Sequence, residues 1–112
     1  MPRPKKCRNV WCTPYITYFK PAGIRVIGLE EVVLTIDEFE AIRLKDLEGL
    51  DQEEAAKRMN ISQPTFHRLV LSARKKVTDA IVNGKAIKIE GGTFKILRPR
   101  RRRLRRGWRG GG

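Results

Sequence analysis

Cysteine and histidine are scarce in this chain of 112 residues: it has two cysteines, Cys7 and Cys12, and one histidine, His67. A structural zinc site takes four protein ligands, so one copy of the chain cannot complete a Cys/His set. The remaining alternative is a metal shared between two copies through both cysteines. We therefore expect no metal and no other cofactor, and thiols that stay reduced in the cytoplasm.

Long apolar runs are missing as well. No stretch approaches the roughly 18 apolar residues of a membrane-spanning helix, and the N-terminal MPRPKK lacks the apolar segment of a signal peptide. We therefore expect a cytoplasmic protein without a membrane partner. An acidic membrane surface also fits poorly, because no amphipathic segment accompanies the arginine-rich C-terminal end.

Acidic residues are absent from both ends of the chain. Residues 1–25 carry six Lys/Arg and residues 98–112 carry eight Arg, with no acid in either range. Residues 26–97 hold eleven basic and twelve acidic groups, so the formal charge of +13 resides at the ends. A near-neutral body with basic ends suggests a polyanionic partner, most simply nucleic acid. The alternative is a charge run that only increases solubility.

The two ends also differ from the middle in composition. Four of the six prolines lie within residues 1–33, which we expect to be a basic extended segment without a long helix. A short extended piece around Ile16–Phe19 should cover the core with its aromatic residues. Residues 98–112 are rich in Arg and Gly, cannot build a core, and should form a disordered tail.

Three helices should follow one another within residues 34–84, the predicted DNA-binding domain. Each begins at a residue that can cap the first turn, and the first two have a Glu three residues later. The starts are Thr35 with Glu38, Asp51 with Glu54, and Ser62. The ends are Leu47 before Gly49, then Met59, and Val82 before Asn83-Gly84.

Two short strands, Ala86–Glu90 and Thr93–Leu97, flank Gly91-Gly92 within residues 85–97. Two glycines suit a tight turn, so we predict a β-hairpin. Because an isolated hairpin is marginally stable, it should pack on the helices or pair with the N-terminal extended segment. The fold class predicted from these elements is mainly α: a tri-helical core with short flanking β segments.

The short interruption between the second and third helices is the most specific pattern in the chain. Two helices joined by a three-to-four-residue turn form a helix-turn-helix, whose second helix enters the DNA major groove. Small residues allow the close crossing, apolar residues fill it, and Asn suits a left-handed turn position. The predicted packing residues are Ala55, Ala56, Met59, Asn60, Ile61, Phe66 and Leu69.

The third helix separates an apolar side from a polar, cationic side when residues are placed about 100° apart. On the polar side, the predicted base contacts are Gln63, Pro64, His67 and Arg68. The predicted contacts to the DNA backbone are Ser62, Thr65, Arg74, Lys75, Lys76 and Lys85. Helix caps are the alternative role for Ser62 and Thr65, a solvated surface is the alternative for Lys75 and Lys76, and an exposed residue without a role is the alternative for His67.

The chain offers little that points to catalysis. The acids Asp37, Glu38, Glu53 and Glu54 stand at predicted helix starts, where capping explains them. No nucleophile–base pair, phosphate-binding loop or metal cluster stands beside them. We therefore expect a protein that is not an enzyme.

The segment LTIDEFEAIRLKDLEGLDQEEAAKRMNISQPTFHRLVLSARKKV resembles the helix-turn-helix of RNA polymerase sigma factor region 4. With MPRPKK, YFKPAG, LEEVVL and NGKAIKIEGG, the chain over residues 1–92 is similar to a family of small, functionally uncharacterised prokaryotic DNA-binding proteins. This resemblance implies a sigma-region-4-like reader of DNA in the winged-helix-like superfamily. It implies no target sequence, because Gln63-Pro64 stands where such proteins often have Arg or another polar pair.

Sequence-specific binding of double-stranded DNA by a transcriptional regulator is the leading hypothesis. One alternative is an RNA-binding or nucleoid-type protein whose arginine-rich tail supplies the affinity. The other is an interaction module whose partner is RNA polymerase. We also expect a homodimer, with the strand pattern at Ala86–Leu97 as its pairing edge and residues 98–112 as a nonspecific anchor.

Overall fold

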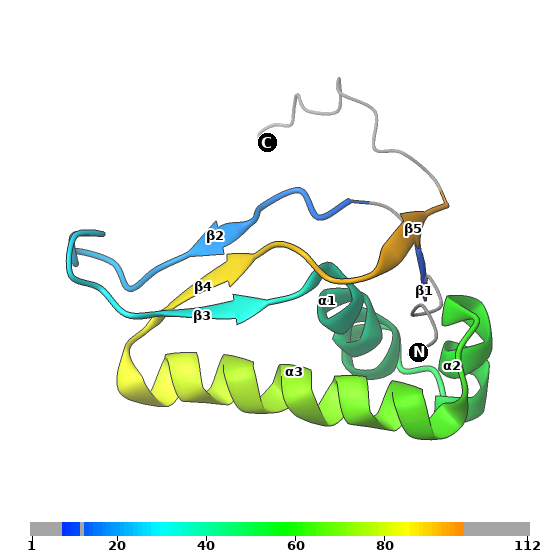
Figure 1. Ribbon diagram of the computed structural model, residues 1–112. Coiled ribbons are helices and arrows are strands. Elements are labelled where there is room, and N and C mark those ends of the chain that lie inside the picture. The colour runs from blue at the N-terminus through cyan, green and yellow to red at the C-terminus, as the bar shows by residue number, and fades with distance from the viewer. Residues whose placement is uncertain (1–7, 12, 98–112) are drawn as a thin grey trace, which may run out of the picture.

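A three-stranded sheet lies along the longest helix in the computed structural model, which describes residues 8–11 and 13–97 (Figure 1). The strands stand in the order β2 (Tyr18–Phe19), β4 (Ala86–Ile89) and β3 (Glu31–Leu34). The central strand, β4, is antiparallel to β2 and parallel to β3. All the helices lie between β3 and β4 in the chain, as a parallel crossover connection requires.

A second, two-stranded sheet pairs β1 (Arg8–Val10) with β5 (Phe94–Ile96) in parallel. The predicted hairpin over residues 85–97 is therefore wrong, although both strands form close to the predicted positions. β4 already has a partner on each edge, so β5 finds no free edge there and pairs with β1 instead. Pairing of β4 with the N-terminal segment is confirmed. Of the dimer edge predicted at Ala86–Leu97, the β4 part has a neighbouring strand on both sides.

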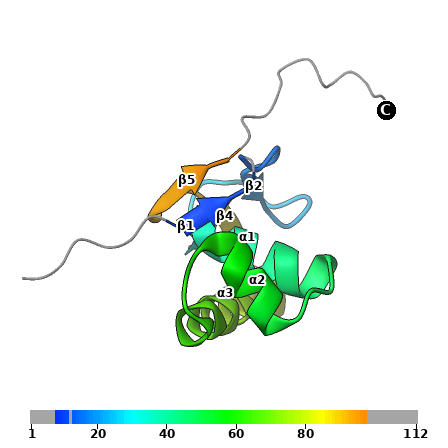
Figure 2. The same ribbon diagram turned by 90° about the vertical axis from the view of Figure 1, so that its right-hand side faces the viewer.

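Three α-helices and a π-helical segment form one layer beneath the strands (Figure 2). They are α1 (Ile36–Ile42), η1 (Arg43–Leu47), α2 (Gln52–Met59) and α3 (Gln63–Asn83). The predicted helix starts and ends are confirmed, but the last five residues before Glu48 are π-helical rather than α-helical. At the end of α3, Gly84 has the positive φ of 67° that glycine adopts without steric cost.

Two clusters of buried residues form the core. One joins α1, α2 and α3 through Ala41, Leu44, Ala55, Ala56, Met59, Phe66 and Val70. The other joins the strands to α1 and α3 through Val10, Leu34, Ile36, Ala73 and Ile89. The expectation that aromatic residues of the N-terminal segment cover the core is wrong for Tyr15 and Phe19, which are 64% and 51% exposed. The buried side chains between sheet and helices are aliphatic, and Phe39 and Phe94 pack against them from outside the N-terminal segment.

Several predictions concern residues outside the described ranges. The arginine-rich tail, the basic residues 1–7, Cys7 and Cys12 all lie there. Within residues 8–11 and 13–97, no three His, Cys, Asp or Glu side chains gather in a way that would hold a metal ion. None of the helices in these ranges has the length and apolar character needed to cross a membrane.

Candidate nucleic-acid interface

The connection between α2 and α3 is a short, well-capped turn. Asn60 ends α2 in the left-handed conformation, with φ 60° and ψ 46°. Two residues later, the hydroxyl of Ser62 accepts a hydrogen bond from the backbone N–H of Thr65 at 3.3 Å and starts α3. The chain thus ends one helix and begins the next within three residues, because each terminal group finds a local partner.

Small and apolar residues hold the two helices close together. Ala55, Ala56, Met59 and Phe66 are at most 2% exposed, and Ile61 and Leu69 pack against them while remaining partly exposed. Because alanine ends at Cβ, α2 and α3 approach without a large side chain between them. All seven predicted packing residues therefore lie at the crossing or in its turn.

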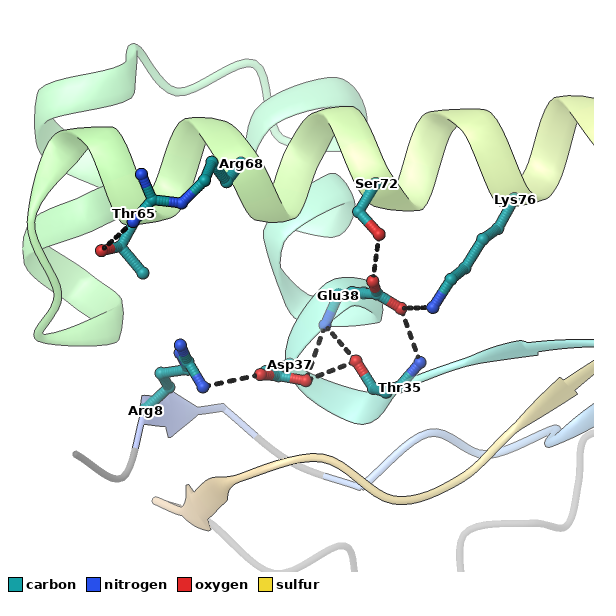
Figure 3. A network of polar contacts seen from close by, with 8 residues as sticks. All are labelled: Arg8, Thr35, Asp37, Glu38, Thr65, Arg68, Ser72 and Lys76. Carbon is teal, nitrogen blue, oxygen red and sulfur yellow. Dashed lines mark hydrogen bonds and ion pairs between the residues drawn. The ribbon is translucent and has the colours of Figure 1, made fainter. Parts of the chain in front are cut away.

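A buried acid on α1 fixes the middle of α3. Glu38, which is 5% exposed, accepts hydrogen bonds from the Ser72 hydroxyl and from Lys76 Nζ at 2.8 Å (Figure 3). It also completes the predicted capping box, since its side chain accepts from the backbone N–H of Thr35 at 2.9 Å. Burial alone would raise the pKa of Glu38, but these donors lower it below its ordinary value.

The neighbouring acid, Asp37, joins α1 to the two-stranded sheet. Its Oδ2 lies 3.2 Å from Arg8 Nη1 of β1 (Figure 3). Gly92, just before β5, passes so close that an added Cβ would lie 2.5 Å from Asp37 Oδ1. Only a residue without a side chain fits there, so Gly92 serves this contact rather than a hairpin turn.

The first two turns of α3 form an open polar surface. The predicted base contacts Gln63, Pro64, His67 and Arg68 are all exposed. Arg68 donates only a long hydrogen bond of 3.4 Å to the hydroxyl of Thr65. The structure therefore brings the four predicted base contacts together on one end of the helix.

Four of the predicted contacts to the DNA backbone fall into two groups, one at the start of α3 and one near its middle. Ser62 and Thr65 lie at the start of α3 and hydrogen-bond to each other as part of the cap. Lys75 is exposed and has no ion pair within the described part of the chain. Beside it, Arg74 forms two hydrogen bonds of 2.6 and 3.0 Å with Asp46. That interaction lowers the pKa of Asp46 and raises the pKa of Arg74.

Two further predicted backbone contacts lie away from the start of α3. Lys76 turns toward Glu38 on α1. Lys85 follows the end of α3 and lies 3.0 Å from Asp79 Oδ2 and 3.7 Å from Glu30 Oε1. The hydrogen bond from Lys85 lowers the pKa of Asp79. The structure does not bring Lys76 or Lys85 together with Arg68.

One cation near the turn was not predicted. Lys57 is exposed on the last turn of α2, where it lines with Gln63 a shallow depression of about 360 Å³. Its position opposite the buried Ala55 and Met59 is visible in the helical pattern of α2. The predicted base and phosphate contacts all lie at or after Ser62, which leaves out this residue of the preceding helix.

The comparisons with known proteins all point to families of uncharacterised proteins. The family model described as "Protein of unknown function DUF134" matches residues 1–97. A UPF0251 protein of Caldanaerobacter subterraneus subsp. tengcongensis is 62% identical over 96 residues, which are 86% of this chain and 81% of the relative. A UPF0251 protein of Thermoanaerobacter sp. is 57% identical over 102 residues, 91% of this chain and 90% of the relative. No solved structure matched the chain.

Proposed function

We propose that this chain, which belongs to the protein family of unknown function DUF134, binds double-stranded DNA sequence-specifically and regulates transcription. In this proposal, α2 and α3 act as a helix-turn-helix like that of sigma factor region 4, and α3 enters the major groove by its N-terminal half. No catalytic step and no cofactor take part. The observation that carries the proposal is the open, acid-free start of α3.

The three α-helices start differently. The first turn of α1 carries Asp37 and Glu38, and that of α2 carries Glu53 and Glu54, whereas the first turn of α3 carries no acid. A helix N-terminus bears about half a positive charge, which nearby carboxylates neutralise. That charge stays available at the start of α3, where it favours an anion such as a DNA phosphate.

The side chains at this end suit DNA bases and phosphates. The Gln63 amide can form two hydrogen bonds with adenine, and the Arg68 guanidinium can do so with guanine. Lys57 lies beside Gln63, Lys75 lies farther along α3, and neither forms an ion pair among the residues that the structure describes. We assign these two lysines to phosphate contacts, which position the protein without reading sequence.

The exposed side of α3 suits duplex DNA better than single-stranded RNA. Sequence-specific RNA binding usually stacks unpaired bases on aromatic side chains. The exposed side of α3 carries no Phe, Tyr or Trp, and Phe66 is buried. A straight helix with polar residues on its first turns instead matches the width of the major groove.

Selection of bound fragments from random duplexes, followed by competition, tests the proposal. The selected duplex should bind more tightly than a scrambled duplex and a single-stranded RNA of equal length, at both low and high salt. Absence of any duplex preference at either salt concentration would overturn the proposal in favour of RNA-binding or nucleoid-type binding. Capture of RNA polymerase without DNA binding would favour the interaction module.

A pair of variants tests whether Gln63 contacts the DNA bases. The change Gln63→Ala alters the first residue of α3, and Gln52→Ala alters the first residue of α2. Gln63→Ala should reduce the preference for the selected over the scrambled duplex, because an amide that bonds to a base is lost. Equal preference in the two variants would remove Gln63 from the base contacts.

A further inference from the structure

The first strand, β1, joins the fold beside the proposed DNA-binding helix. It lies at the same end of the molecule as α2 and the start of α3, at the right of Figure 1, and it contacts α1 and α2. Residues 1–7 precede β1 in the chain, so they are attached to the fold at this end. Arg8, the first residue of β1, is the point of attachment.

Arg8 is anchored on the side of α3 that carries Arg68. Its Nη1 lies 3.2 Å from Asp37 Oδ2, and the next residue of α1, Glu38, accepts a hydrogen bond from the Ser72 hydroxyl. Arg68 comes four residues before Ser72 and therefore lies on the same side of α3. Figure 3 shows Arg8 level with Arg68 along α3. The chain before β1 is thus attached next to the predicted base contacts.

The side chain of Arg8 serves this attachment and not the DNA. It is only 16% exposed and forms an ion pair with Asp37. Any contact with DNA on this side of α3 must therefore come from the residues that precede Arg8.

Those residues have a composition that suits DNA. Among residues 1–7, Arg3, Lys5 and Lys6 are basic and none is acidic, and two prolines disfavour a helix. Five extended residues reach about 17 Å from Arg8. This distance exceeds the roughly 12 Å width of the major groove, so Arg3 can pass the sugar-phosphate backbone beside α3 and enter the next groove.

The family match separates this segment from the other basic part of the chain. The family model covers residues 1–97, so it includes the three cations before β1 and leaves out the arginine-rich residues 98–112. The segment before β1 and α3 therefore belong to one family-wide unit, whereas the arginine-rich tail lies outside it.

We propose that residues 2–6 form an arm that enters the minor groove next to the major groove occupied by α3. This inference rests on the proposed function. The minor groove is about 6 Å wide, which admits an extended chain but not a helix of about 10 Å. Where it is narrow, its negative potential attracts arginine and lysine. Arg3 enters the groove, and Lys5 and Lys6 bind the phosphates at its edge.

Protection of a selected duplex from dimethyl sulfate tests the arm, because this reagent methylates guanine N7 in the major groove and adenine N3 in the minor groove. The duplex carries adenines on both flanks of the selected site. The arm variant of the full chain combines Arg3→Ala, Lys5→Ala and Lys6→Ala. The matched control replaces the three arginines at positions 101–103 with alanine, which removes the same charge from the tail. Circular dichroism confirms that both variants keep their helices.

The wild-type chain should protect guanine N7 within the site and adenine N3 on one flank. The arm variant should lose the protection of adenine N3, keep that of guanine N7, and bind about tenfold more weakly. The control should keep both protections.

Three results would overturn the arm. Protection of guanine N7 alone by the wild-type chain removes the arm and leaves the proposed function standing, whereas protection in neither groove removes both. Flank protection that survives in the arm variant, or that the control loses to the same extent, assigns the minor-groove contact to another part of the chain.

Discussion

The two ends of α3 have opposite chemistry although they belong to one continuous helix. At the N-terminal end, Gln63, His67 and Arg68 are exposed, and the first turn has no acid. At the other end, Ile81 and Val82 are about three-quarters exposed, and the nearby cation Lys85 is paired with Asp79. One end offers hydrogen-bonding and cationic groups to solvent, and the other exposes apolar surface to water.

Carboxylates, rather than the number of cations, make this difference. The basic residues of α3 are Arg68 and the run from Arg74 to Lys76, so the sequence alone suggests a positive side over the middle of the helix. Asp46 pairs with Arg74, Glu38 with Lys76, and Asp79 with Lys85. These acids come from three different elements and neutralise the later part of the helix. Among the described residues, Arg68 in the first turns forms no ion pair, whereas Lys85 and, to a smaller extent, Lys75 lower the pKa of Asp79.

The largest expected effect comes from a substitution that removes the packing that holds the N-terminal end of α3 in place. Phe66 is fully buried between α2 and α3, so Phe66→Ala should lower the free energy of unfolding by about 3–5 kcal/mol. The control Leu71→Ala changes a residue one and a half turns later that is 49% exposed. Urea titration checks both. Similar losses in the two variants would show that Phe66 is not a core residue.

The second expected effect compares two arginines on the same helix. Arg68→Ala should weaken binding to a preferred duplex by about 1–3 kcal/mol, because a base contact is lost. Arg74→Ala should cost less, because Asp46 already neutralises Arg74. Fluorescence anisotropy on selected and scrambled duplexes measures both changes. Equal losses for the two arginines on every duplex would assign Arg68 to the phosphates. The N-terminal end of α3 would then not differ from the rest of the helix in reading bases.

The third expected effect concerns the contact that holds α3 between its ends. Lys76→Met removes a donor from buried Glu38 and should reduce stability at neutral pH by about 1–2 kcal/mol. The pKa of Glu38 is lowered from its ordinary value of 4.5. Its stabilising contribution is therefore complete above about pH 4.5 and is lost as the pH falls through the lower folded pKa.

Unfolding as a function of pH separates this effect from a general loss of charge. The difference between wild type and Lys76→Met should shrink as Glu38 becomes protonated. Lys75→Met is the control, because the neighbouring Lys75 is exposed and has no ion pair within the described ranges. A difference that stays constant down to low pH would mean that Lys76 stabilises the helix without acting through Glu38.

The helices of this fold could be predicted from sequence because their signals are local. Thr35, Asp51 and Ser62 each cap a helix within the next three residues, and Asn60 and Gly84 end helices through their own backbone conformation. The π-helical segment could not be predicted in this way. Its apolar residues fit the stripe of an ordinary helix, and nothing in their spacing indicates the wider turn.

The strands and the ion pairs depend on residues far apart in the chain. A Gly-Gly pair predicts a hairpin locally, but β4 receives both its partners from residues before the helices. Likewise, the spacing of Arg74 and Lys76 predicts a cationic side, whereas their partners Asp46 and Glu38 lie 28 and 38 residues away in the chain. The candidate site was therefore predictable at the turn and in the first turns of α3, and not beyond Leu71.

The smallest expected effect comes from a substitution that places an acid at the start of α3, where the helix has none. Gln63→Glu should stabilise the folded chain by about 0.3–1 kcal/mol, because a carboxylate interacts favourably with a helix N-terminus. The same charge should weaken binding to every duplex severalfold, because it repels the phosphates that the helix start would attract. Gln52→Glu makes the matched change at the start of α2, where Glu53 and Glu54 already stand. It should leave DNA binding almost unchanged. A loss of both stability and binding in Gln63→Glu would show that the acid-free start of α3 serves folding rather than DNA.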